Sequence, residues 1–185
     1  MKPDLAIYQP TPPEIVDHML ALAAISSGDV LYDLGCGDGR IVVTAAEKYG
    51  IRAVGVDINP KRIAEAQANA RQRGVEGLVE FRQSDAKKIN VSDATVVTLY
   101  LGAASNLRLM ERLRAELRPG SRIVSRNFQI YGWIPDRLET LVLPNGVPTY
   151  LYLWMIGKPE GQARPAELPV LSGGNRTKLK PKSWA

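Results

Sequence analysis

Apolar residues recur along the chain at two spacings, one typical of helices and one typical of strands. Ile15, Met19, Leu22 and Ala23 repeat at helical spacing up to a stop at 26–29, and the preceding Thr-Pro-Pro-Glu at 11–14 has the spacing of a capping box. Further helices are expected at 40–49, from 60 to about 74, and along a stripe of Leu107, Met110, Leu113 and Leu117. Compact apolar runs predict strands at 30–34, 52–57, 78–83, 94–101 and 121–125.

The last part of the pattern differs from the rest. Apolar runs at 138–143 and 149–156 flank 144–148, where Asn-Gly marks a hairpin. Strands that alternate with helices predict a parallel, doubly wound sheet. The expected fold class is therefore α/β, a Rossmann-like doubly wound sheet of seven strands, mostly parallel, with a C-terminal antiparallel hairpin. Ligands of such sheets bind at the carboxyl ends of the strands, near the point where strand order reverses.

Composition and charge limit the function classes. The chain has 185 residues, 45% of them apolar and 23% charged, which is typical of an ordinary globular domain. Of the net charge of +5, the segment 158–185 carries +4, from six basic and two acidic residues. A body with a net charge of only +1 has no strong nucleic-acid signature. We expect one domain at 1–157, with a helical lead-in, and a basic, disordered tail at 158–185.

Cysteine usage and the N-terminal sequence bear on the compartment. Cys36 is the only cysteine, so no intrachain disulfide can form, and a reducing cytoplasm is expected. The first residues lack the apolar run of a signal peptide, and no stretch approaches the roughly 20 apolar residues of a membrane span. We therefore expect a protein that is neither exported nor embedded in a membrane.

Candidate chemistry lies at the ends of the first three predicted strands. Gly35, Gly37 and Gly39 follow the first strand, and Asp33, Asp57 and Asp85 are at or next to the ends of three successive strands. The glycines should let backbone N–H groups approach a ligand closely. One carboxylate can chelate a ribose diol, and another can accept from the exocyclic amine of adenine. This set indicates S-adenosylmethionine as the ligand.

A dinucleotide is the main competing ligand for that loop. Its fingerprint is G-x-G-x-x-G, whereas here the third glycine is Gly39 and position 40 is Arg40. Asp33 and Asp38 flank the place where a pyrophosphate would lie over a helix N-terminus, and like charges there would repel it. A plain strand-to-helix turn is the remaining alternative for the loop taken alone.

Several segments resemble class I S-adenosylmethionine-dependent methyltransferases. They are Tyr-Gln-Pro-Thr-Pro at 8–12, the loop at 32–41, the fourth-strand sequence at 96–101 and Gly-Trp at 132–133. Within that superfamily they are similar to the small archaeal broad-specificity protein-lysine methyltransferases, whose mitochondrial relatives modify lysines on ATP-handling membrane proteins. The resemblance covers about residues 5–157, which would make the domain at 1–157 a class I methyltransferase domain. The chain departs from it at 125–128, Ser-Arg-Asn-Phe, where the family pattern has His and an acidic residue beside the Phe.

The resemblance implies roles for particular residues. It places Gly35, Gly37 and Gly39 against the methionyl part of the cofactor, Asp33 at its amino group and Asp57 at the ribose hydroxyls. It places Asp85 and Ala86 at the adenine, with Ile58 also among the cofactor-binding residues, and it makes Tyr8 and Thr11 a lid. Tyr100 is the catalytic candidate, lining the methyl-transfer channel. For Tyr8 and Tyr100, ordinary packing against the domain or in its core is an equal alternative. No metal site is expected.

These observations predict an S-adenosylmethionine-dependent methyltransferase that acts, as a monomer in the cytoplasm, on exposed lysines of proteins. The sequence offers no obvious general base, since His18, the only histidine, lies in the first helix. No Asn-Pro-Pro-Tyr follows the fourth strand, so the usual signature for methylating an amino group on a base is absent. A small-molecule N- or O-methyltransferase and a non-catalytic cofactor-binding module are the alternatives.

Overall fold

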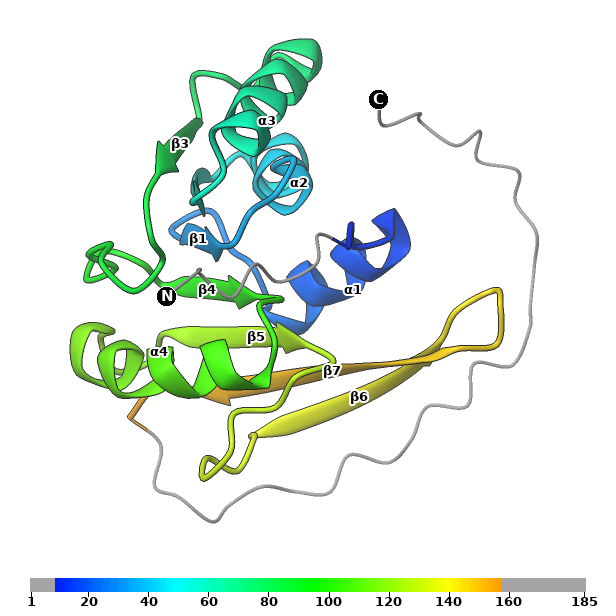
Figure 1. Ribbon diagram of the computed structural model, residues 1–185, viewed down its shortest axis with the longest axis vertical. Helices are drawn as coiled ribbons and strands as arrows, with labels where there is room; N and C mark the ends of the chain where they lie inside the picture. Colours follow the sequence, from blue (N-terminus) through cyan, green and yellow to red (C-terminus); the bar gives the residue numbers. More distant parts are fainter. Residues whose placement is uncertain (1–8, 158–185) are drawn as a thin grey trace.

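Seven strands form one sheet within residues 9–157, the part of the chain that this computed structural model describes (Figure 1). Their order across the sheet is β3-β2-β1-β4-β5-β7-β6. The strands are β1 (Val30–Leu34), β2 (Arg52–Asp57), β3 (Val79–Gln83), β4 (Val96–Leu99), β5 (Arg122–Arg126), β6 (Arg137–Val142) and β7 (Pro148–Met155). The strands β1 to β5 pair in parallel, and β7 is antiparallel to both β5 and β6. The predicted fold class is therefore confirmed.

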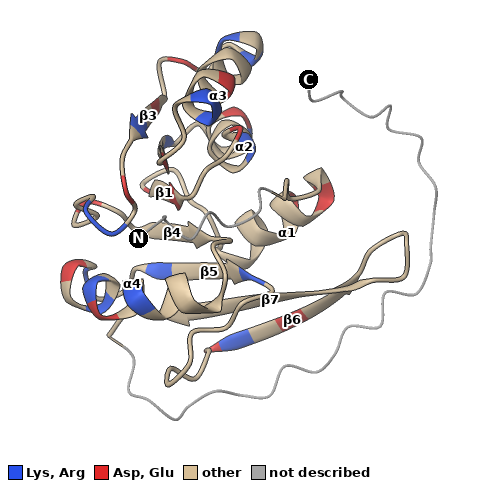
Figure 2. Cartoon of the chain, viewed as in Figure 1, with Lys and Arg blue, Asp and Glu red and all other residues tan. Residues whose placement is uncertain are grey.

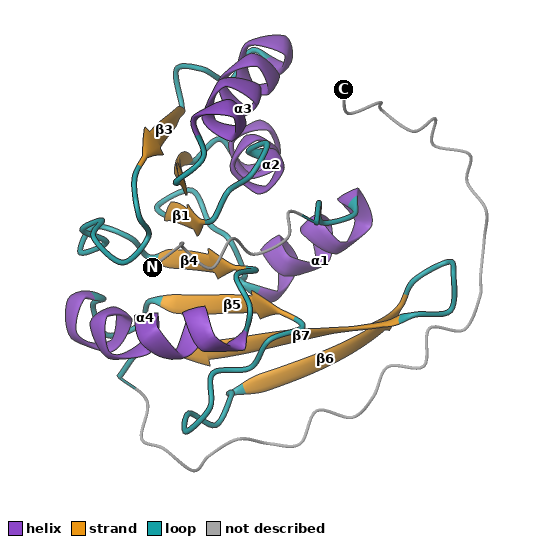
Figure 3. Cartoon of the chain, in the orientation of Figure 1, coloured by secondary structure: helices purple, strands orange, loops and turns teal. Residues whose placement is uncertain are grey.

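Four helices of the described residues cover the two faces of the sheet (Figure 3). They are α1 (Pro13–Leu22), α2 (Arg40–Tyr49), α3 (Pro60–Arg73) and α4 (Ala103–Glu116). The first three pack on one face, where Leu20, Val42 and Ile63 join one buried apolar cluster. On the other face, Leu109 and Leu113 of α4 pack with Ile89 and Val91 from the loop between β3 and β4. That loop therefore packs on the same face of the sheet as α4.

Local sequence signals explain where α2 and α3 begin and end. The Asn59 side chain accepts the Lys61 N–H at 3.0 Å, and Pro60 opens α3, where its missing N–H is harmless. Gly50 and Gly74 end the two helices in the left-handed conformation, with φ of 65° and 67°. The bounds predicted for α2 and β2 are those observed.

Two predicted details were wrong. Thr11 does not cap α1, because the Pro12 carbonyl already accepts the N–H groups of Ile15 and Val16, which makes Pro12 the N-cap, with no side-chain cap. The fourth strand is four residues long instead of eight, because the chain turns toward α4 after Leu99. The hairpin forms as predicted, with the loop 143–147 closed by a bond from the Leu143 N–H to the Val147 carbonyl.

Chain order reverses at the centre of the sheet. From β1 the chain moves outward through β2 and β3, then returns to β4 on the other side of β1 and continues to β5. The register places Asp33 beside Thr98, one residue before the end of each strand. Ligands of doubly wound sheets bind at such a reversal.

No helix within residues 9–157 is long and apolar enough to cross a membrane. Tyr8 and the tail expected at 158–185 lie outside the described residues. The division of the chain into a domain and a tail stays a prediction.

Trp154 is the largest side chain of the core. It is fully buried, its Nε1 donates to the Trp133 carbonyl at 3.0 Å, and its ring lies 5.9 Å from that of Trp133. We predict that Trp154→Ala lowers the free energy of unfolding by about 3–5 kcal/mol, measured by urea denaturation. Tyr131→Ala, at a 58% exposed aromatic, should cost no more than about 0.5 kcal/mol. Equal losses in the two variants would contradict this account of the core.

Candidate active site

Asp33 is a buried carboxylate on the central strand. Its Oδ1 accepts the Thr98 hydroxyl at 2.7 Å, and no Lys, Arg or His of residues 9–157 lies within ion-pair distance of it. Burial raises the pKa of Asp33 from its ordinary 3.8 to about 7. The Thr98 hydrogen bond acts in the opposite direction, while the carboxylates of Asp57 and Asp38 raise the pKa further. Within the described residues, Asp33 therefore either carries a negative charge without a cationic partner or keeps its proton.

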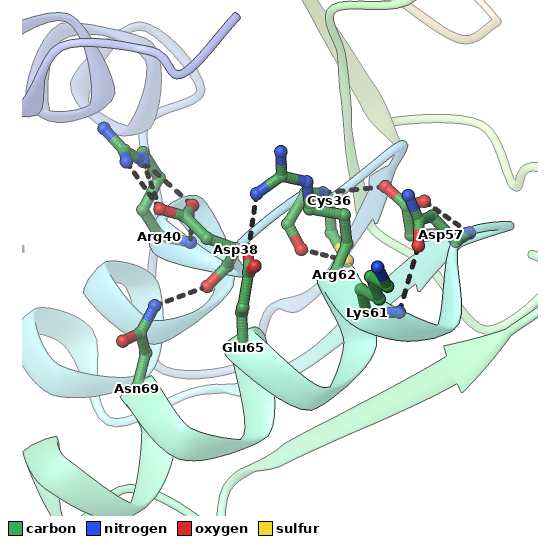
Figure 4. A network of polar contacts seen from close by, with 10 residues as sticks. Cys36, Asp38, Arg40, Asp57, Lys61, Arg62, Glu65 and Asn69 are labelled. Carbon is green, nitrogen blue, oxygen red and sulfur yellow. Dashed lines mark hydrogen bonds and ion pairs between the residues drawn. The ribbon is translucent and has the colours of Figure 1, made fainter. Parts of the chain in front are cut away.

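Asp57 sits at the end of β2 and fixes the glycine loop. Its Oδ2 accepts the Gly37 N–H at 2.9 Å, and its Oδ1 accepts the Asn59 N–H at 2.8 Å (Figure 4). Each carboxylate oxygen can accept more than one hydrogen bond. Asp57 therefore holds the loop in place and still has acceptor capacity for a ligand.

The glycine N–H groups are used inside the protein, contrary to the expectation that they would face a ligand. Gly35 donates to the Val56 carbonyl at 2.7 Å, Gly37 to Asp57, and Gly39 to the Cys36 carbonyl at 2.9 Å. The need for glycine is steric and conformational instead. A Cβ on Gly35, whose φ is +88°, would lie 2.2 Å from Leu101 Cδ2.

Gly39 shows the same constraint on the other side of the loop. A Cβ there would lie 2.7 Å from the Ala66 Cβ and 2.8 Å from the Phe81 ring. The residue also has a φ of +76°, which favours glycine. The loop is therefore packed tightly between α3, β3 and the end of β4.

Asp38 is neutralised by its own neighbour. The Arg40 Nε donates to both Asp38 oxygens, at 2.9 and 3.2 Å, and the Asp38 carbonyl accepts the Asn69 side chain at 2.9 Å (Figure 4). Arg40 Nη1 also donates to the Thr11 carbonyl at 2.9 Å, which ties the lead-in of α1 to the start of α2. Of the two carboxylates thought to repel a pyrophosphate, only Asp33 is unpaired within the described residues.

Asp85 lies beside Asp57, beyond the end of β3. The Ser84 N–H donates to the Asp57 carbonyl at 3.0 Å, and Asp85 Oδ1 accepts the Lys87 N–H at 2.9 Å. Ile58, directly after Asp57, is 50% exposed, while Ala86 is half-buried against the core. An apolar side chain and two carboxylates thus share this part of the edge.

Tyr100, just past β4, is held from three sides. Its hydroxyl donates to Gln9 Oε1 at 2.8 Å, its ring stacks on Phe128 with centroids 5.8 Å apart, and the Arg126 guanidinium carbon lies 4.5 Å from the ring centre. Thr11 is buried close by, and its Oγ1 lies 3.4 Å from Arg126 Nη1. Tyr100 is therefore half-buried at the sheet edge and not a core aromatic.

Sequence reasoning missed four residues of this edge, namely Gln9, Thr98, Arg126 and Phe128. A signal for Thr98 was present, because it is the polar residue in an apolar strand, as is Asp33 in β1. Arg126 is likewise a polar residue in a buried strand, at the end of β5. No group of three or more His, Cys, Asp or Glu side chains in residues 9–157 could hold a metal ion.

Asp33 should make stability depend on pH. Between about pH 4 and 7 the native state keeps a proton that the unfolded chain releases, so the free energy of unfolding falls as pH rises through this range and levels off above it. Asp33→Asn has no carboxyl group to titrate and therefore removes this loss of free energy of unfolding. We predict that the variant matches the wild type near pH 4 and exceeds it by up to about 4 kcal/mol at pH 8.

Urea denaturation at several pH values measures this difference. Asp17→Asn, at an exposed aspartate on α1 that pairs with Lys48 at 2.6 Å, is the matched control and should show no such trend. A constant offset between wild type and Asp33→Asn at every pH would show that Asp33 does not take up a proton on folding.

Comparisons with known proteins identify the family of the chain. A family model described as the ANTKMT methyltransferase domain matches residues 33–137. A protein-lysine N-methyltransferase of Saccharolobus islandicus is 43% identical over 82% of this chain and 94% of its own length. An adenine nucleotide translocase lysine N-methyltransferase of Mus musculus is 38% identical over 65% of this chain, a match that spans 52% of that protein.

A solved structure gives the same result for the fold. The crystal structure of an RNA methyltransferase from Salinibacter ruber, in complex with S-adenosyl-L-homocysteine, is 44% identical to this chain. It covers 88% of this chain and 97% of its own, with a TM-score of 0.74. The glycine loop, the acidic strand ends and these relatives together lead to one conclusion. The chain belongs to the ANTKMT methyltransferase domain family and is an S-adenosylmethionine-dependent methyltransferase with a Rossmann-like fold.

Proposed function

We propose that the protein methylates lysine side chains of other proteins. The observation that carries this proposal is the 43% identity to the Saccharolobus islandicus protein-lysine N-methyltransferase, which extends over 94% of that protein. The mouse relative also has lysine methylation in its name. The site adds physical support, because its acidic edge suits a cationic cofactor and Tyr100 lies next to that edge.

Asp33 is proposed to hold the amino group of the cofactor. An ammonium group beside this carboxylate would supply the cation that residues 9–157 do not place there, and would favour the ionised form. Asp57 is proposed to accept both ribose hydroxyls, in addition to the Gly37 N–H that it already binds.

The adenine is proposed to lie over the ends of β2 and β3. The half-exposed Ile58 offers an apolar contact for the base, and Asp85 an acceptor for its exocyclic amine. Ala86 leaves space there because its side chain is small. Thr11 is proposed to close over the methionyl end, together with Tyr8, which lies outside the described residues.

A bound cofactor would supply a sulfonium methyl group to a lysine amine that has already lost its proton to solvent, with the sulfur–carbon bond breaking as the nitrogen–carbon bond forms. Tyr100 is proposed to line the channel through which the lysine enters. Its ring, which contacts both Phe128 and Arg126, would orient the acceptor without forming a bond to it.

The acceptor amine must lose a proton before transfer. With a reference pKa near 10.4, this costs about 4 kcal/mol at neutral pH. Desolvation of the lysine beside a positively charged sulfonium would disfavour the ammonium form and offset part of that cost without a dedicated base. His18 is exposed on α1, and none of the hydrogen bonds and ring contacts that Tyr100 makes with residues 9–157 involves a carboxylate.

RNA methylation is the second candidate, because the Salinibacter ruber structure is that of an RNA methyltransferase. The near-neutral body of this chain does not favour it, and α4 carries acidic residues among its basic ones (Figure 2). We also propose that the enzyme works in a reducing cytoplasm, as the single cysteine suggests. The monomeric state expected from the sequence stays a prediction.

The test is incubation of the full chain with methyl-labelled S-adenosylmethionine and a cell lysate, followed by separation into protein, RNA and small molecules. We predict label in protein, recovered as methyl-lysine after hydrolysis. With cofactor below saturation, Asp33→Asn should reduce the label by about 10- to 100-fold, as the loss of a charged hydrogen bond implies. Asp17→Asn, outside the site, should retain wild-type labelling.

Other outcomes contradict the proposal in distinct ways. Label in RNA would support the second candidate, and label only in small molecules would indicate a small-molecule methyltransferase. Label on protein residues other than lysine would overturn the acceptor assignment while leaving the cofactor site intact.

A further inference from the structure

Arg126 is a buried cation at the carboxyl end of β5. It is 5% exposed, and its Nε has no hydrogen-bond partner among residues 9–157. The hydrogen bond from its Nη1 to Thr11 Oγ1 is long, at 3.4 Å. No carboxylate of the described residues lies within ion-pair distance. Burial of a charge without a counter-charge is unfavourable, so its retention calls for a reason beyond packing.

The groups that face Arg126 leave its charge uncompensated. Tyr100 at the end of β4 and Glu14 on α1 favour the protonated guanidinium, but Glu14 is exposed and Tyr100 contacts the guanidinium through its ring. On the β7 side the paired residue is Leu151. Burial lowers the pKa of Arg126, yet an arginine remains charged throughout the working range of an enzyme.

The Arg126 guanidinium lies against Tyr100, the residue that is proposed to line the channel for the acceptor lysine. The register pairs Leu99 with Ser125, so the next residues, Tyr100 and Arg126, leave adjacent strands at the same edge. The guanidinium carbon is 4.5 Å from the Tyr100 ring centre, a distance typical of a cation–π contact. Arg126, Tyr100 and Phe128 thus form one cluster, which we call the Tyr100 clamp.

We propose that Arg126 is a positioning residue of the acceptor site: it holds the face of the Tyr100 ring and places a positive charge beside the entering lysine, so that the lysine reacts as the neutral amine. This inference rests on the proposed lysine acceptor. It explains how transfer proceeds without a general base, because the guanidinium repels the ammonium form and leaves the amine unaffected. The proton goes to solvent before the nitrogen–carbon bond forms.

The size of the effect follows from Coulomb's law. Two positive unit charges about 6 Å apart repel each other, and at an effective dielectric near 20 this repulsion lowers the pKa of the acceptor lysine by about 2 units. At neutral pH this raises the fraction of neutral amine by up to about 100-fold.

The test is the pH dependence of kcat, with saturating cofactor and a lysine peptide that the wild-type full chain methylates. The kcat profile reports ionisations in the enzyme–substrate complex. We predict that Arg126→Met moves the rise of kcat upward by about 1–2 pH units, with a loss of about 10- to 100-fold near pH 7 that shrinks at high pH. Arg126→Lys keeps a cation and should keep the shape of the wild-type profile, with kcat lower by the same factor at every pH.

A less basic acceptor provides an independent readout. In a peptide whose target lysine is replaced by aminoethylcysteine, the sulfur withdraws electrons and makes the amine easier to deprotonate. The activity of Arg126→Met relative to wild type should therefore be higher on this peptide than on the lysine peptide. Thermal unfolding and binding of S-adenosylhomocysteine, measured on both variants, identify any loss that comes from misfolding.

Two results would overturn the inference alone. One is an Arg126→Met variant that loses the same factor at every pH and on both peptides, as expected of a purely structural residue. The other is a raised KM with an unchanged kcat profile, as expected if Arg126 binds an anionic group of the acceptor. A wild type that transfers no methyl group to lysine would overturn the proposed function, and this inference with it.

Discussion

The constraint on which the site depends is a surplus of negative charge at the reversal point of the sheet. Asp33 is buried there with a threonine hydroxyl at 2.7 Å and no cation of residues 9–157 within ion-pair distance, while Asp57 lies close enough to raise its pKa. Without a ligand this arrangement is unfavourable, because a buried carboxylate must be ionised without a partner or keep a proton near neutral pH. A cofactor that carries an ammonium and a sulfonium would supply the missing charge. The same edge is therefore unsuited to a pyrophosphate.

The glycine loop makes that crowding possible. Gly35 and Gly39 leave no room for a Cβ, against Leu101 on one side and Ala66 with Phe81 on the other, so the ends of β1, β2 and β4 come together. Two buried charges of opposite sign, Asp33 and Arg126, then lie at this edge of the sheet. Asp38 is matched by Arg40, which also fixes the lead-in of α1, whereas Asp33 and Arg126 lack ion-pair partners within the described part of the chain. We propose that Asp33 pairs with the cationic cofactor and that Arg126 lies beside the acceptor amine.

The sequence predicted the architecture well because its signals are local. Asn59-Pro60 and Gly50 act within a few residues, and the bounds of α2 and β2 agree with the structure, whereas the fourth strand is shorter than predicted. Thr11 was assigned wrongly as a cap, because a spacing rule does not show that the Pro12 carbonyl takes both N–H groups. The contacts of Arg126 and Gln9 with Tyr100 could not be predicted, since they join segments 26 and 91 positions apart through tertiary packing. Thr98 beside Asp33 required the strand register, which the sequence pattern does not give.

The most direct measurement is the affinity for S-adenosylhomocysteine by calorimetry at pH 6 and pH 8. If the cofactor amino group pairs with ionised Asp33, whose pKa is about 7, only about a tenth of the carboxylate is ready to bind at pH 6. The wild type should then bind about tenfold more weakly at pH 6 than at pH 8, whereas Asp33→Asn should bind weakly and equally at both. Wild-type affinity that does not change with pH, or an Asp33→Asn variant that binds as tightly as the wild type, would contradict the account.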